Sequence, residues 1–294
     1  MADDFTPLAS LSLTHVYYNP EDPLSFLCAF LSLLPQALCV VYVTLLWSTR
    51  EAEVLLMFAG QLACEAVNFA LKRLIKEERP KLGAGVGKGY GMPSSHAQFV
   101  VFWAVAVSLF LLVRHRPRPS RQERAAAAVV RKGSSEAREQ GKRDGTRHGG
   151  LAADVSRAYR TGGFPALNTS IEAYAHAPWT LAERGLVSAV VLLVAGLVAW
   201  SRVYLGYHTV RQVLAGCAAG AGCAAAWFAV TYLLRETGAL AWALELPPAR
   251  WFRVRDLVVA EDLCQAGWEK WEERRRMALE EERQRERGKE KKDN

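Results

Sequence analysis

Three short segments of the sequence hold side chains that could together bind and transfer a phosphoryl group: residues 72–80, 93–96 and 201–208. The first and third carry cationic side chains, the second carries two serines, and the second and third each carry a histidine. Cations and helix N-termini bind phosphate oxygens, and an imidazole can act as nucleophile or acid. Each segment alone is weak evidence, because basic residues beside a membrane helix usually set topology. Together on one face of a protein, the segments predict phosphoryl transfer.

Apolar runs flank all three segments and are the elements that must position them. Hydrophobic residues make up 51% of the chain, yet its mean hydropathy is +0.00, so apolar and polar stretches are segregated. A helix needs about 20 apolar residues to cross a bilayer core of about 30 Å. Runs of roughly this length occupy residues 24–47, 53–71, 96–113, 186–200 and 213–234. We therefore expect an all-α polytopic membrane helical bundle of about five (four to six) transmembrane helices.

Details inside these runs refine the expected bundle. Pro35 predicts a kink in the first span. The fifth span contains AGCAAGAGCAAA, and small residues of this kind let helix backbones approach closely. Lys72 and Arg79 are seven residues apart, so they share one helical face if the second helix continues to Pro80.

The rest of the chain is polar. Residues 1–23 are expected at the surface, ahead of the two core parts, residues 24–113 and 181–240. Between these parts, residues 114–180 are rich in Arg, Lys, Gly and Ser, which predicts a disordered basic insert. Residues 241–294 are expected to form a charged helical tail, with tryptophans that could anchor it at a membrane interface: Trp251, Trp268 and Trp271.

The formal net charge of +7 does not indicate binding to nucleic acid. The basic residues are concentrated in the insert, the tail and one short loop, all beside apolar spans, which is the pattern of membrane topology. The six cysteines show neither CxxC nor Cys/His metal spacing, and no carboxylate-rich cluster is present. No metal site and no cofactor are therefore predicted.

An odd number of spans places the two ends of the chain on opposite faces of the membrane. The N-terminus, residues 72–95 and residues 201–212 then share one face, and the insert and tail share the other. Because the insert and tail carry the excess of Lys and Arg, they are expected in the cytosol. The three candidate segments are therefore expected on the lumenal face.

The order K-x6-RP, PSSH and SR-x5-H resembles the motifs of the type 2 phosphatidic acid phosphatase superfamily of membrane phosphatases. The resemblance covers residues 24–235 without the insert. Within that superfamily, the segment SRVYLGYHTVRQV is most similar to the dolichyl diphosphate phosphatase branch.

The resemblance implies a role for each motif residue. His208 corresponds to the nucleophile that forms a phosphohistidine, and His96 to the acid that protonates the leaving oxygen. The phosphate would be held by Lys72, Arg79, Ser94, Ser95 and Arg202, and the family acts without a metal. One residue departs from the usual pattern: Gln212 stands where most members have an aspartate that orients the nucleophilic imidazole. Its amide oxygen can still accept from the ring but brings no charge.

The resemblance also implies an activity and a location. We expect a hydrolase of acid anhydrides in the endoplasmic reticulum membrane that converts dolichyl diphosphate into dolichyl phosphate and phosphate, recycling the carrier lipid of protein N-glycosylation. The alternatives are a phosphatase of phosphatidate or another lipid phosphate, and a non-catalytic membrane scaffold of the same fold. Lys291 and Lys292 resemble a C-terminal dilysine signal, which predicts recognition by a coat protein on a cytosolic tail.

Overall fold

The structure, a computed structural model, describes residues 9–11, 16–80, 89–116 and 179–293. Five helical spans in these ranges are long and apolar enough to cross a membrane: Pro23–Thr49, Ala52–Ile75, Ser95–Arg114, Leu181–Tyr204 and Val210–Glu236. The prediction of an all-α polytopic bundle is thereby confirmed. Residues 117–178, which make up nearly all of the predicted insert, lie outside the described residues.

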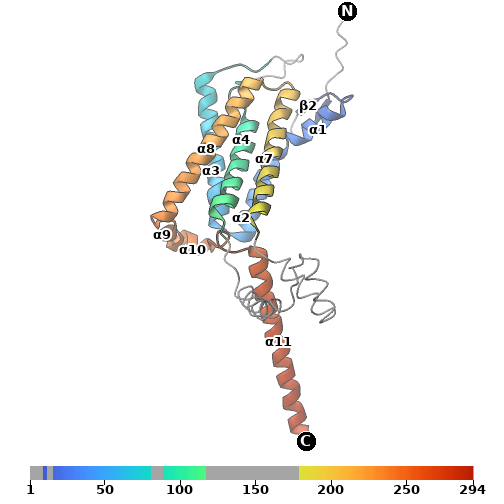
Figure 1. The fold of residues 1–294 in the computed structure, drawn as a ribbon, viewed down its shortest axis with the longest axis vertical. Coiled ribbons are helices and arrows are strands. Elements are labelled where there is room, and N and C mark those ends of the chain that lie inside the picture. The colour runs from blue at the N-terminus through green and yellow to red at the C-terminus, as the bar shows by residue number, and fades with distance from the viewer. Residues whose placement is uncertain (1–8, 12–15, 81–88, 117–178, 294) are drawn as a thin grey trace, which may run out of the picture. The chain divides into compact units, whose positions relative to one another are not determined.

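Two short strands are followed by helices, and the long helices make up the bundle (Figure 1). In chain order they are β1 (Ala9–Leu11), β2 (Val16–Tyr18), α1 (Pro23–Leu31), α2 (Leu34–Thr49), α3 (Ala52–Ile75), α4 (Ser95–Leu109), the π-helical turn η1 (Phe110–Arg114), α7 (Leu181–Tyr204), α8 (Val210–Glu236), α9 (Ala239–Glu245), α10 (Pro247–Phe252) and α11 (Leu263–Asp293). The chain divides into two units. Met1–His115 with Leu181–Val259 holds the spans, and Arg116–Thr180 with Ala260–Asn294 includes α11.

The first span is broken where the sequence predicted only a kink. α1 ends at Leu31, and α2 begins at Leu34 with Pro35 in its first turn. Proline has no N–H to donate and its ring excludes the preceding turn, so it suits the start of a helix better than its middle. The break leaves Ser32 between the two helices, fully buried.

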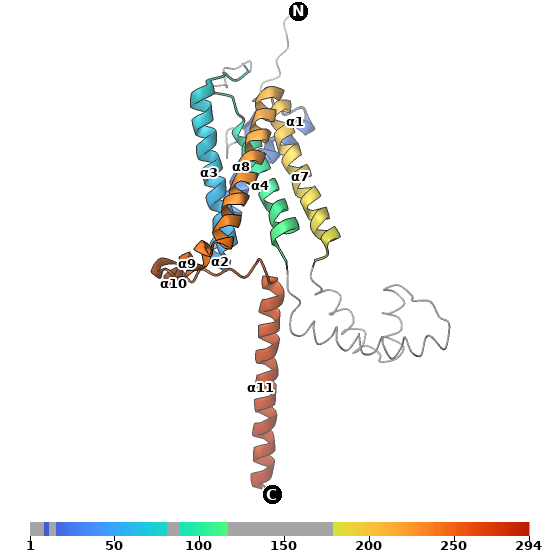
Figure 2. The same cartoon turned by 60° about the vertical axis from the view of Figure 1, so that its left-hand side comes forward.

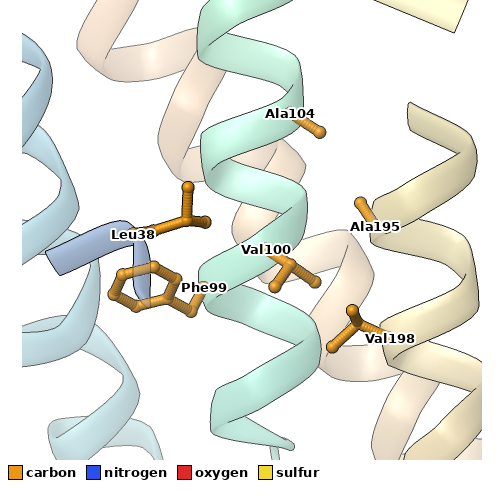
Figure 3. Packing of buried hydrophobic residues seen from close by; sticks show 6 residues of the cluster. All are labelled: Leu38, Phe99, Val100, Ala104, Ala195 and Val198. Atoms are coloured by element: carbon orange, nitrogen blue, oxygen red, sulfur yellow. The ribbon is translucent and has the colours of Figure 1, made fainter. Parts of the chain in front are cut away.

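α4 is the central helix, and α3, α7 and α8 pack around it (Figure 2). Figure 3 shows a core cluster around α4, in which Phe99, Val100 and Ala104 of α4 lie between Leu38 of α2 and two residues of α7, Ala195 and Val198. Many large apolar side chains on the outer faces, such as Leu62 and Leu193, are more than half exposed. This distribution is expected when lipid rather than water surrounds the bundle.

Close contact between α4 and α8 depends on glycine. A Cβ atom on Gly216 would lie 2.6 Å from the carbonyl oxygen of Ser94, and one on Gly220 would overlap the carbonyl oxygen of Gln98. The small residues of the fifth span therefore let α8 rest directly on the α4 backbone, as predicted. The contact brings the start of α8 to the start of α4, where the Ser94 N–H donates to the Gln212 carbonyl at 3.1 Å.

The N-terminal strands do more than cover the surface. β1 and β2 pair antiparallel, and Val16 of β2 is buried against Cys28, Leu205 and Tyr207. The Tyr17 N–H donates to the Tyr207 hydroxyl oxygen at 2.7 Å. These contacts support the turn between α7 and α8 from one side, a function that the polar composition of residues 1–23 did not predict.

Ion pairs around the buried Glu53 close the opposite end of the bundle. Glu53 accepts from Arg114 and from Arg235, at 2.6 Å each, and Arg235 also pairs with Asp256. Glu51 accepts the backbone N–H groups of residues 257 and 258 at 2.8 and 3.0 Å. Residues 253–259 are thereby held against the ends of α2 and α3, so the unit that contains the spans extends beyond residue 240.

Candidate active site

The three predicted segments come from the same end of the bundle. α3 ends there and leads into residues 76–80, α4 begins there at Ser95, and the turn between α7 and α8 carries His208 (Figure 1). Backbone contacts join the segments. Gly91, just before α4, donates its N–H to the carbonyl of Glu77 at 2.7 Å, and Ser94 donates to Gln212.

His208 lies in a tight turn that its neighbours fix. The N–H groups of Tyr207 and His208 both donate to the Arg202 carbonyl, at 3.1 and 3.2 Å, and Gly206 takes a φ of 71°, which glycine adopts without strain. Thr209 then caps α8 in a capping box with Gln212. The result is an imidazole that is only 3% exposed.

The tautomer of His208 follows from the hydrogen bonds of Gln212. The Gln212 amide nitrogen faces two acceptors, a carboxylate oxygen of Glu77 at 3.0 Å and the carbonyl of Glu78 at 2.8 Å. The amide oxygen therefore faces His208, with 3.2 Å between Oε1 and Nδ1. Because an amide oxygen only accepts, Nδ1 carries the proton, and Nε2 keeps its lone pair. The structure thus has the contact expected of Gln212.

Arg202 is buried without an anionic partner. It is 3% exposed, its Nη1 donates to the Ser32 hydroxyl at 2.6 Å, and its guanidinium lies 4.3 Å above the Tyr207 ring. Among the described residues, neither Arg202 nor the other two predicted cations, Lys72 and Arg79, forms an ion pair. An arginine buried in this way is expensive unless an anion joins it.

The start of α4 offers further donors. Ser94 is the N-cap residue and fully buried, yet its hydroxyl makes no capping bond and has no partner among the described residues. Ser95 is the first residue of the helix, where the backbone N–H groups have no acceptor within the helix. His96 follows, within electrostatic range of Arg202, His208 and Lys72. Together these groups make an anion site that also holds two imidazoles.

The electrostatics of the site keep the His208 ring neutral. Burial, together with the positive charges of Arg79 and Arg202, lowers the pKa of His208 to about 4. Burial also lowers the pKa of Arg79. At neutral pH, Nε2 of His208 is therefore available as a nucleophile, while the arginine remains charged because its ordinary pKa is so high.

The condition under which Lys72 and Arg79 would share a helical face, a second helix that continues to Pro80, is not met. Lys72 and Arg79 do not share a helical face, because α3 ends at Ile75 and Lys76 takes a left-handed conformation with φ 52°. The chain then turns, and Glu78 pairs with Tyr90. Lys72 and Arg79 are nevertheless within electrostatic range of one another. Proximity thus arises from the turn rather than from helical spacing.

Three residues of the site were not predicted from the sequence. Ser32 binds Arg202, Tyr207 lies beneath its guanidinium, and Glu77 binds Gln212. Tyr207 and Glu77 stand inside the motif segments, so their position could have suggested a role. Among the described residues, no three His, Cys, Asp or Glu side chains are grouped so that they could hold a metal ion.

The fold and the site belong to a known class of protein. The family model described as the PAP2 superfamily matches residues 52–236, and the chain belongs to this superfamily. The family prediction made from the motifs is thereby confirmed.

Particular relatives extend the similarity over most of the chain. A Neurospora crassa protein named "Putative dolichyldiphosphatase" is 59% identical over 94% of this chain and 95% of its own length. Human "Dolichyldiphosphatase 1" is 33% identical over 75% of this chain and 71% of its own. The Saccharomyces cerevisiae "Dolichyldiphosphatase" is 27% identical over 83% and 79%. No solved structure matches significantly.

Proposed function

We propose that this protein hydrolyses dolichyl diphosphate to dolichyl phosphate and inorganic phosphate, and so recycles the carrier lipid of protein N-glycosylation. The observation that carries the proposal is the meeting of the three motifs around a neutral, buried His208, beside cations that pair with no carboxylate of the described residues. The names of the relatives supply the identity of the lipid.

The first half of the reaction transfers the terminal phosphoryl group to the protein. The lone pair of His208 Nε2 forms a bond to the terminal phosphorus, and the bond from phosphorus to the bridging oxygen breaks. The electron pair goes to the departing lipid phosphate, which takes a proton from His96. The transferred oxygens are held by Lys72, Arg79, Ser94, Ser95 and Arg202.

The second half releases phosphate. Water attacks the phosphorus of the phosphohistidine, the N–P bond breaks, and its electron pair returns to Nε2. His96, now unprotonated, takes the proton of the attacking water. The negative charge of the bound diphosphate favours the protonated form of His96 at the start of each cycle. The lipid tail is expected to lie in the bilayer beside the helices, while the diphosphate enters the cationic site.

The proposed location is the endoplasmic reticulum membrane, with the site in the lumen and the C-terminus in the cytosol. The spans alternate in direction, so the site and the ends of the helices that lead to the insert lie at opposite ends of the bundle (Figure 1). The excess of Lys and Arg in the insert and tail supports a cytosolic side for them. Recognition of Lys291 and Lys292 by a coat protein stays a prediction.

The substrate is tested by phosphate release from two lipids. Purified protein in detergent, with a chelator present, is given dolichyl diphosphate or phosphatidate, and His208→Ala is the control for contaminating phosphatase. We expect a higher kcat/KM for dolichyl diphosphate, unaffected by the chelator. Equal or faster hydrolysis of phosphatidate would favour the general lipid phosphatase. No hydrolysis of either lipid by folded protein would favour the non-catalytic scaffold.

Orientation is tested in sealed microsomes. Peptide tags are placed at residue 140 and at the C-terminus, and protease is added outside the microsomes. Both tags should be digested without detergent. Protection of either tag would reverse the proposed orientation and place the site on the cytosolic face.

A further inference from the structure

Gln212 joins His208 to a carboxylate on a different segment of the chain. Its amide oxygen lies 3.2 Å from His208 Nδ1 and 3.3 Å from the Thr209 nitrogen, which donates to it. Its amide nitrogen donates to the Glu77 carboxylate at 3.0 Å and to the Glu78 carbonyl at 2.8 Å. The amide thus uses both of its N–H groups and both acceptor positions of its oxygen. Such a group has one orientation and passes polarisation from one side to the other.

Glu77 has the features of a charge that acts through this amide. It forms no ion pair among the described residues, although Arg79 is two positions away. Within the part of the chain that the structure describes, its carboxylate accepts a single side-chain hydrogen bond, the one from Gln212. Gly91 lets its segment pack directly against Gln212, since a Cβ atom there would lie 2.8 Å from the Gln212 amide. The Glu77 carboxylate thus lies on one side of the fully buried Gln212 amide, and His208 lies on the other.

We infer that Glu77 is a positioning residue for His208: through the Gln212 amide it supplies the negative charge that an aspartate at position 212 would supply directly. When Nε2 bonds to phosphorus, the ring becomes positively charged, and the charge is shared with the Nδ1–H that Gln212 accepts. A carboxylate behind the amide makes its oxygen a stronger acceptor and stabilises that charge. No proton leaves Nδ1 in the step. The inference rests on the proposed function for its catalytic consequence.

The chain offers a matched control. Glu78 is adjacent, carries the same charge and is exposed, and only its backbone carbonyl contacts Gln212. Glu77, Gln212 and His208 form a hydrogen-bonded relay. Glu77→Gln removes the charge from this relay while leaving an oxygen that can accept from Gln212. Glu78→Gln removes a charge from the same segment but not from the relay. A general electrostatic effect of the segment would move both variants alike.

Kinetics separate a positioning role from a structural one. Glu77→Gln is expected to lower kcat by about tenfold, the low end for partners that orient a reacting group, with KM within about twofold. Glu78→Gln is expected to leave both unchanged. The double variant Glu77→Gln with Gln212→Glu places a carboxylate directly beside the His208 Nδ1–H, and it should recover most of kcat. If the two single variants have equal kcat values, or if the double variant recovers nothing while folded, the inference is wrong.

A second measurement needs no substrate, so it also separates this inference from the proposed function. In the intact protein labelled with ¹⁵N-histidine, the Nδ1–H proton of His208 is observed by NMR in detergent micelles and assigned with His208→Asn. Glu77→Gln should shift this resonance upfield, because the hydrogen bond to Gln212 weakens, and Glu78→Gln should not. An unmoved resonance overturns the relay, whichever lipid the wild type hydrolyses. A moved resonance with no hydrolysis of dolichyl diphosphate supports the relay and contradicts the substrate.

Discussion

At the end of the bundle where α8 stops, Arg114 and Arg235 each contact a carboxylate oxygen of Glu53 at 2.6 Å, and Glu53 is 3% exposed. At the end where α8 begins, Arg202 is equally buried, and its guanidinium contacts the Ser32 hydroxyl and the Tyr207 ring but no carboxylate of the described residues. Both ends therefore bury the guanidinium of an arginine. They differ in whether a carboxylate of the described residues pairs with that arginine.

The difference separates stability from function. A buried arginine with a hydrogen-bonded carboxylate satisfies its charge within the fold, and breaking such a pair costs about 3–5 kcal/mol. A buried arginine with no carboxylate makes the empty protein less stable and is compensated only when an anion binds. The first arrangement fastens the ends of α3, α8 and residues 253–259 together. The second is what the proposed phosphate site requires.

Among the variants that test this comparison, Arg202→Gln is expected to have the largest effect on activity. Removing a cation that we propose binds the transferred oxygens should lower kcat/KM by about a hundred- to a thousandfold. The unfolding temperature should stay the same or rise, because an unpaired buried charge is lost. Phosphate release and thermal unfolding in detergent measure the two effects. A marked drop in the unfolding temperature would mean that Arg202 is structural, like Arg114.

Glu53→Gln should do the reverse. It leaves Arg114 without its only carboxylate partner among the described residues, and leaves Arg235 with Asp256 alone. We expect a loss of about 3 kcal/mol in the free energy of unfolding and a kcat close to that of the wild type below the unfolding temperature. Glu78→Gln, which removes an exposed carboxylate, is the control. An unchanged free energy of unfolding in Glu53→Gln would contradict the claim that these ion pairs stabilise the fold.

A smaller expected effect concerns the pKa of His208, which depends on the cations around it. The lowered pKa of His208 means that the ring stays neutral until the pH falls through about 4, whereas an unperturbed histidine would gain its proton near 6.5. Arg79→Gln removes one cause of the lowering and should raise this pKa, while Arg114→Gln should not. Histidine ¹⁵N shifts between pH 4 and 7 measure both variants. Titration near 6.5 in the wild type would show that the site does not hold the ring neutral.

The sequence predicted the spans and the shared end of the motifs, because both follow from the length of a bilayer crossing. Five apolar runs alternate in direction, so segments after the second span, before the third and between the last two must lie at one end. Helix limits were less certain. α7 extends beyond residues 186–200 at both ends, and α3 passes residue 71 and stops before Arg79.

The partners of the motif residues could not be predicted, since they depend on how distant helices pack. Ser32 and Arg202 are 170 positions apart, and Glu77 and Gln212 are 135 apart. The pairing of Glu53 with Arg235 spans 182 positions. Local spacing identified Glu53 only as the first residue of a span and Gln212 only as a departure from the usual aspartate. Nothing in either pattern indicates which side chain lies opposite.

Trapping the phosphorylated intermediate tests the role of His208 most directly. Wild-type protein is mixed with dolichyl diphosphate labelled in the terminal phosphate, quenched within milliseconds in base, where phosphohistidine survives, and digested for mass spectrometry. We predict label on the peptide that contains His208 in the wild type, and neither label nor phosphate release in His208→Ala. Label on another residue, or steady phosphate release from folded His208→Ala, would contradict the account.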